Sequence, residues 1–101
     1  MCGIVGIFDP QSSSENQKKK IKNCLSISHH RGPDENGVFT DEKNHITIGM
    51  NRLSILDIKN GQQPLFSQDG RYCIIFNGEI VNSEDLKIKL KSQIQKFFYT
   101  C

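Results

Sequence analysis

Residues 1–10 read MCGIVGIFDP, and this opening stretch decides how the chain can begin to fold. The run from residue 3 to residue 8 is apolar throughout and is followed by Asp9-Pro10. A short apolar run between glycine and such a breaker predicts a buried strand. A cysteine stands directly in front of this run, so we expect Cys2 at the end of a sheet.

The composition limits the classes of protein to which the chain can belong. Its 101 residues are enough for one small domain. Hydrophobic residues make up 36% and charged residues 24%, which is typical of a soluble globular protein. The 13 basic and 11 acidic residues leave a net charge of +2, too small to indicate nucleic acid or an anionic membrane as a partner. The lysine-rich stretch 18–22 is interpreted as a solvated helix face.

Neither a membrane segment nor a secretion signal is predicted. No stretch approaches the roughly 20 apolar residues that a membrane span needs, and the opening lacks the basic start of a signal peptide. A cytoplasmic location is therefore expected. The four cysteines, which form no C-x-x-C pair and no zinc-like spacing with His29 and His30, are expected to be free thiols without a metal. These cysteines are Cys2, Cys24, Cys73 and Cys101.

Periodicity predicts mixed helices and strands. Residues 15–29 form an expected amphipathic helix, capped by Ser13 or Ser14, and residues 82–94 a second one, capped by Ser83. The buried faces are assigned to Ile21, Cys24, Leu25 and Ser28 in the first helix and to Leu86, Leu90 and Ile94 in the second. A loop is expected over 29–37. Strands are expected over 3–8, 37–42, 45–50 and 52–58, and a hairpin over 65–68 and 71–76 around Asp69-Gly70.

Cys2 carries the first chemical hypothesis. Removal of Met1 would leave Cys2 as the first residue, with a free α-amino group beside its thiol. Such an amine is partly unprotonated near neutral pH and can accept the thiol proton, directly or through one water. Nucleophile and base then belong to one residue, and no histidine is required. The alternative is a buried, inert cysteine behind a retained methionine.

Four further motifs follow in order, and together with the opening they carry a resemblance. They are RGPD (31–34), NRLSILD (51–57), GQQP (61–64) and NGEIVN (77–82). The chain resembles the glutamine-hydrolysing domain of the class II amidotransferases, within the asparagine synthetase branch. That resemblance implies an α+β fold, the α/β/β/α sandwich of N-terminal-nucleophile hydrolases. Residues 1–101 would form a partial glutamine amidotransferase type 2 domain, about the first half of that sandwich, with the synthetase domain absent.

The resemblance also implies residue roles. Cys2 would attack the side-chain amide of glutamine, and the Asn77 side chain with the Gly78 backbone N–H would stabilise the oxyanion. Arg52 would bind the α-carboxylate of glutamine, and Glu79 its ammonium group. The neighbouring wall of the pocket would be formed by Leu53, Ser54, Ile55 and Leu56. The RGPD motif is interpreted as structural support for the Cys2 pocket.

The implied activity is the glutaminase half of glutamine-dependent asparagine synthesis. Its partners would be L-glutamine and a synthetase domain or subunit that uses ATP and magnesium, with a homodimer possible for the full-length enzyme. No cofactor or metal is expected in this chain itself. Two alternatives remain open: a non-catalytic truncated fragment that binds a partner, and a glutaminase part that serves another acceptor.

Overall fold

The computed structural model describes residues 2–54 and 61–91. Within them the chain forms strands, two α-helices and one 3-10 helix, η1. In chain order these are β1 (Gly3–Phe8), α1 (Ser14–Ile27), η1 (His29–Arg31), β2 (Glu35–Asp41), β3 (Ile46–Arg52), β4 (Leu65–Phe66), β5 (Cys73–Ile74) and α2 (Ser83–Lys91).

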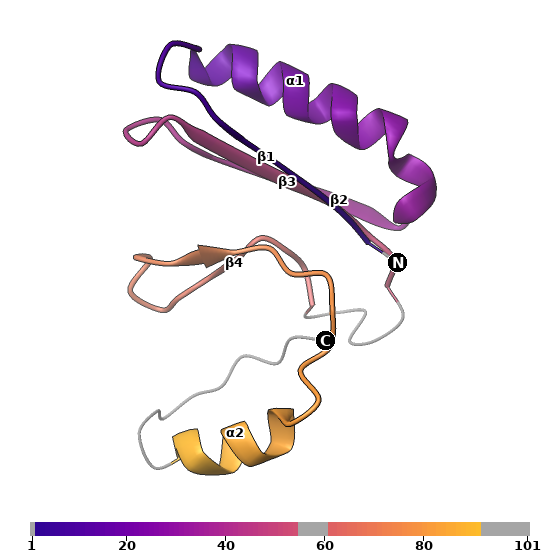
Figure 1. The fold of residues 1–101 in the computed structure, drawn as a ribbon, viewed down its shortest axis with the longest axis vertical. Coiled ribbons are helices and arrows are strands. Elements are labelled where there is room, and N and C mark those ends of the chain that lie inside the picture. The colour runs from indigo at the N-terminus through magenta and orange to yellow at the C-terminus, as the bar shows by residue number, and fades with distance from the viewer. Residues whose placement is uncertain (1, 55–60, 92–101) are drawn as a thin grey trace.

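These elements are arranged in layers (Figure 1). Helix α1 lies along the three-stranded sheet, whose strand order is β1-β3-β2. The β4-β5 hairpin follows on the other side of that sheet, and α2 lies beyond the hairpin. The described residues are therefore α+β in class, and their layers run helix, sheet, sheet, helix.

Strand β3 is the centre of the larger sheet, because it pairs with β1 on one side and β2 on the other, both antiparallel. Its last two residues set the register there: Asn51 faces Gly3, and Arg52 faces Glu35. Side chains alternate between the two faces of a strand. Asn51 contacts α1 through its amide, so Met50 and Arg52 lie on the opposite face, toward the hairpin.

A narrow apolar core joins α1 to the sheet. Ile21 and Leu25 of α1 are buried, at one-turn spacing, as the periodicity predicts. Cys24 was assigned to the same face but is exposed, because it lies about a quarter turn away from Ile21 and Leu25. On the other face of the sheet, the Phe39 ring of β2 meets the Phe66 ring of β4 edge-on, with centroids 5.0 Å apart.

Two buried amides fix α1 to the sheet, one near each of its ends. Gln17 is fully buried, and its Nε2 donates to the carbonyl oxygens of Asp9 and His45 while its Oε1 accepts from Thr47 Oγ1. Asn51 Nδ2 donates to the carbonyl oxygen of Leu25 at 2.7 Å and to Ser28 Oγ at 3.0 Å. Each of these two buried amides thus has hydrogen-bond partners, as buried amides require.

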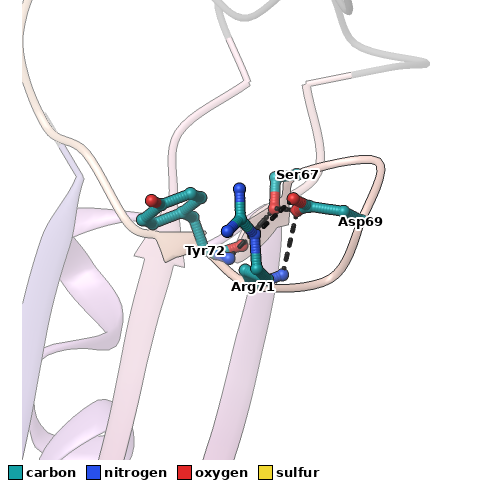
Figure 2. Close-up of polar contacts among 4 residues, drawn as sticks. All are labelled: Ser67, Asp69, Arg71 and Tyr72. Atoms are coloured by element: carbon teal, nitrogen blue, oxygen red, sulfur yellow. Dashed lines mark hydrogen bonds and ion pairs between the residues drawn. The ribbon is translucent and has the colours of Figure 1, made fainter.

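The hairpin loop is built around one carboxylate (Figure 2). Asp69 Oδ1 accepts from Ser67 Oγ at 2.6 Å and from the Arg71 backbone N–H at 3.1 Å, and Oδ2 pairs with Arg71 Nε at 2.6 Å. Tyr72 N donates to Ser67 Oγ, which closes the loop. Gly70 has a φ of 71°, so the predicted Asp-Gly turn is confirmed.

Several predicted boundaries were wrong. Helix α1 ends at Ile27 and η1 follows it, so the loop expected over 29–37 is shorter than predicted, and β2 already begins at Glu35. The strand expected over 52–58 is described only as far as Ser54; of residues 52–54, Arg52 alone is in a strand, as the last residue of β3. Residues 55–58 lie outside the described part. Tertiary pairing with β3 decided these boundaries, and a local pattern contains no information about it.

Helix caps gave one correct and one incorrect prediction. Ser13 caps α1, because its Oγ accepts from Asn16 N at 3.2 Å. Ser83 is instead the first residue within α2, and the first helical bond runs from Leu86 N to the carbonyl oxygen of Asn82, which puts Asn82 in the cap position. No residue of α2 is buried; its predicted apolar face includes Leu86, which is 38% exposed.

Replacing Asn51 with alanine is expected to destabilise the attachment of α1. The change removes two hydrogen bonds and leaves the Leu25 carbonyl without this donor, which should lower the free energy of unfolding by about 1–3 kcal/mol. Urea unfolding followed by far-UV circular dichroism measures this. Asn23→Ala on the exposed face of α1 is the control and should change stability by less than about 0.5 kcal/mol. Equal destabilisation by the two variants would contradict the role of Asn51.

Acid is expected to loosen the hairpin loop through Asp69. Its bonds to the Ser67 hydroxyl, the Arg71 backbone N–H and the Arg71 guanidinium lower the pKa of Asp69 below the usual 3.8. The carboxylate therefore stabilises the folded loop fully above that value, and the contribution is lost as the pH falls through the lowered pKa. An NMR titration should show the Arg71 amide signal moving at that lower pH, and Asp69→Asn should abolish the shift. A midpoint at or above 3.8 would refute the prediction.

Candidate functional site

Three segments meet at Cys2. The β1–β3 register pairs Gly3 with Asn51, so Cys2, which precedes β1, lies at the end of the sheet where β3 ends in Arg52. The backbone N of Leu53 donates to Cys2 Sγ at 3.4 Å. From the segment after β5, Asn77 Nδ2 donates to the carbonyl oxygen of Cys2 at 3.0 Å. Residues that are 51 and 75 positions away in the chain are thereby brought to the cysteine.

The three described cysteines are free thiols in different environments. Cys2 is half-buried with a backbone N–H directed at its sulfur. Cys24 is exposed on α1, and burial raises the pKa of the Cys73 thiol. Cys73 is therefore a poorer source of thiolate at neutral pH.

Arg52, the predicted carboxylate-binding residue, is almost completely buried at the end of β3, with 2% of its surface exposed. Its Nη1 lies 3.0 Å from Glu35 Oε2 on β2. A planar guanidinium is well suited to bind a carboxylate in bidentate fashion. The position next to Cys2 is compatible with the predicted role.

The RGPD motif supports the segment that contacts the thiol. Asp34 N donates to the carbonyl oxygen of Arg52 at 3.2 Å, and Asp34 Oδ2 accepts from Ser54 N at 2.7 Å. Gly32 packs against the same backbone, since a Cβ there would lie 2.5 Å from the Asn51 carbonyl carbon. The backbone of residues 52–54 is thus fixed from one side, which is compatible with the predicted structural role of this motif.

The GQQP motif supports the segment that contains Asn77. Gln63 Oε1 accepts from Phe76 N at 2.6 Å, while its Nε2 donates to the Phe76 carbonyl oxygen at 3.1 Å. The amide of Gln63 therefore pairs with both backbone groups of the residue before Asn77, as a neighbouring strand would. A Cβ at Gly78 would lie 2.9 Å from the Phe76 ring, so glycine allows this close approach.

The other predicted residues are placed as follows. Asn77, Gly78 and Glu79 form an exposed segment after β5. Leu53 and Ser54 are half-buried, and the Ser54 hydroxyl oxygen is buried with no hydrogen-bond partner in the part of the chain that the structure describes. Ile55 and Leu56 lie outside the described residues. The structure brings Leu53 and Asn77 each into contact with Cys2. Among residues 2–54 and 61–91, Glu79 finds no hydrogen-bond or ion-pair partner.

Two residues that support the candidate site were not identified from the sequence. Glu35, the ionic partner of Arg52, lay in a segment predicted to be a loop, so its pairing with β3 was not foreseen. Gln63 belonged to a quoted motif but had no assigned role. The GQQP motif was the one sequence signal that pointed to Gln63. Its hydrogen-bond partner, Phe76, is 13 residues away, and only the fold brings the two together.

Neither described helix is long and apolar enough to cross a membrane. Among residues 2–54 and 61–91, no group of three or more His, Cys, Asp and Glu side chains is arranged to hold a metal ion.

The sequence matches the glutamine amidotransferase domain family over residues 1–100. The chain therefore belongs to this family, whose fold class is the N-terminal-nucleophile type, in agreement with the helix, sheet, sheet, helix order described above. The predicted family is confirmed.

Within this class the chain is similar to glutamine-hydrolysing asparagine synthetases. It is 45% identical over 95 residues to asparagine synthetase 1 of Bacillus subtilis, covering 92% of this chain and 15% of that protein. It is 33% identical over 95 residues to asparagine synthetase B of Escherichia coli, covering 94% and 17%. With asparagine synthetase 1 of Arabidopsis thaliana it shares 33% identity over 92 residues, covering 91% and 15%. The chain thus spans about a sixth of the length of these relatives.

Replacing Asp34 with alanine is expected to free the Ser54 amide. The charged acceptor for this N–H is lost, so its hydrogen exchange should become about tenfold faster while the fold is retained. Amide exchange followed by NMR measures this directly. Asp85→Ala on α2 is the matched control and should leave the exchange at Ser54 unchanged. Unaltered exchange in Asp34→Ala would show that Asp34 does not fix this segment.

Proposed function

We propose that this chain performs the glutaminase half of a glutamine-dependent amidotransferase reaction, with Cys2 as nucleophile. One observation carries the proposal: the Cys2 thiol, the Leu53 N–H and the Asn77 amide converge at the end of β1, beside Arg52. Membership of the glutamine amidotransferase family supports the same reaction. Glutamine is therefore the proposed substrate.

The proposed reaction proceeds through a thioester. With Met1 removed, the α-amine of Cys2 takes the thiol proton, and the sulfur attacks the side-chain amide carbon of glutamine. The resulting tetrahedral intermediate carries its negative charge on oxygen. When the C–N bond breaks, the proton held by the amine passes to the leaving nitrogen and ammonia is released. Water then adds to the thioester, the C–S bond breaks, and glutamate and the free thiol are formed.

Asn77 and Gly78 are the proposed oxyanion donors. The Asn77 amide nitrogen carries two N–H bonds, and the contact with the Cys2 carbonyl oxygen orients it next to the nucleophile. A preorganised donor of this kind contributes roughly 2.7–4 kcal/mol to transition-state stabilisation. Gln63 supports this role because it holds Phe76, the residue directly before Asn77.

The amino-acid end of glutamine is the part that the remaining residues would recognise. Arg52 would bind the α-carboxylate, and Glu79 the α-ammonium group. Leu53 and Ser54, continuing into Ile55 and Leu56, would form the wall between them. The Ser54 hydroxyl, buried and without a hydrogen-bond partner among the described residues, would be a polar group in this wall.

The released ammonia would be used by a synthetase domain, in which ATP and magnesium activate the acceptor. The relatives are named glutamine-hydrolysing asparagine synthetases, which supports asparagine as the product; aspartate is the proposed acceptor. A cytoplasmic enzyme that forms homodimers at full length is part of the same proposal. Ile4 and Phe8 of the edge strand β1 are 54% and 70% exposed, so this strand offers an apolar surface for such a partner.

Cys2→Ser is expected to reduce ammonia release from glutamine by at least about a thousandfold, because the nucleophile is lost. Cys24→Ser is the matched control, since that thiol is exposed on α1 away from the site, and it should leave the rate unchanged. Release is measured with a coupled ammonia assay. Intact mass spectrometry with a glutamine-like electrophile should show loss of Met1 and a single modification, mapped to Cys2.

Two outcomes would contradict the proposal. One is a folded chain with Cys2 at its terminus that releases no ammonia and is not labelled at Cys2. If the same chain associates with itself as concentration rises, the partner-binding alternative is favoured instead. The other is labelling at Cys73 or Cys24 in preference to Cys2.

A further inference from the structure

The ion pair between Arg52 and Glu35 lies one residue before Leu53, whose backbone N–H contacts the Cys2 thiol. Glu35 and Arg52 are direct cross-strand partners in the β2–β3 register. Residues that face each other across neighbouring strands have Cβ atoms about 5 Å apart. The sheet itself therefore keeps the Glu35 carboxylate beside the guanidinium.

Burial makes this carboxylate important for Arg52. The Arg52 side chain is 3% exposed and that of Glu35 is 35% exposed, so water reaches the acid but hardly the base. Removing a counter-charge from a buried guanidinium is disfavoured. The contact at 3.0 Å joins Glu35 Oε2 to one nitrogen, Nη1, of a rigid planar group. One such contact to a planar group restricts the directions in which its N–H bonds can point.

We propose that Glu35 is a positioning residue for glutamine recognition: it orients the Arg52 guanidinium for the α-carboxylate of the substrate and balances its charge before the substrate arrives. The inference rests on the proposed function, in which Arg52 binds that carboxylate. Glu35 does not touch the reacting atoms, so its effect is on glutamine affinity and not on the bond-breaking steps.

A competing role for Glu35 predicts the opposite change in glutamine affinity. If Glu35 simply occupied the place of the substrate carboxylate, its removal would let glutamine bind more tightly. The positioning role predicts weaker binding on removal, because Arg52 would lose a charged contact that orients it. A change in KM for glutamine therefore separates the two mechanisms.

The test compares Glu35→Ala with Glu35→Gln, which retains a carbonyl oxygen that can accept from Nη1. For the alanine variant we expect the KM for glutamine to rise about tenfold with kcat within about twofold of wild type. The glutamine variant should restore most of the affinity. Glu15→Gln, an equal charge change in the first turn of α1, is the control. An unchanged or lower KM in Glu35→Ala would overturn the proposal.

A second measurement does not depend on activity. The Nε–H NMR signal of Arg52 should be sharp and slowly exchanging in the wild-type chain and in Glu35→Gln, and exchange-broadened in Glu35→Ala. If the wild-type chain releases no ammonia but the Arg52 signal behaves in this way, the proposed function fails while the orienting contact stands. An Arg52 signal that is the same in all three proteins overturns the positioning role.

Discussion

The pairing of β3 with both of its neighbours is the constraint on which the rest of the structure depends. Because β3 is the central strand, its register fixes Gly3 against Asn51 and Glu35 against Arg52 at the same time. A slip by one residue would exchange the two faces of the strand. Arg52 would then point toward α1, and the Asn51 amide would lose its bonds to Leu25 and Ser28. One register thus supports both the core and the site.

The helix is held by polar contacts as much as by apolar ones. Ile21 and Leu25 give α1 a narrow apolar contact with the sheet, while Gln17 and Asn51 specify where along the sheet the helix lies. Apolar contact is not directional, whereas a buried amide must find its particular partners. The position of α1 is therefore defined near both ends, and with it the turn through η1 into the RGPD motif.

The candidate site consists of short segments that follow the ends of strands and are held in place by neighbouring side chains. The residues that contact Cys2 lie just beyond the ends of strands, at Leu53 after β3 and at Asn77 after β5. Each is fixed by a neighbouring polar side chain: Asp34 holds the backbone around Arg52 and Ser54, and Gln63 holds Phe76. Segments outside the sheet can thus be placed accurately without strand pairing of their own, because side-chain groups replace the missing backbone partners.

The sequence by itself determined the types of elements, the Asp-Gly hairpin, the Ser13 cap and the family, because these depend on local periodicity, turn chemistry and the order of motifs. It also singled out Cys2, Arg52 and Asn77 as candidate residues. Only the tertiary structure decided that Glu35 pairs with Arg52, that Gln63 pairs with Phe76 and that β2 begins before Gly37. Those contacts join residues 13 or more positions apart, and their partners are set by strand register and layer packing, which a local pattern does not encode.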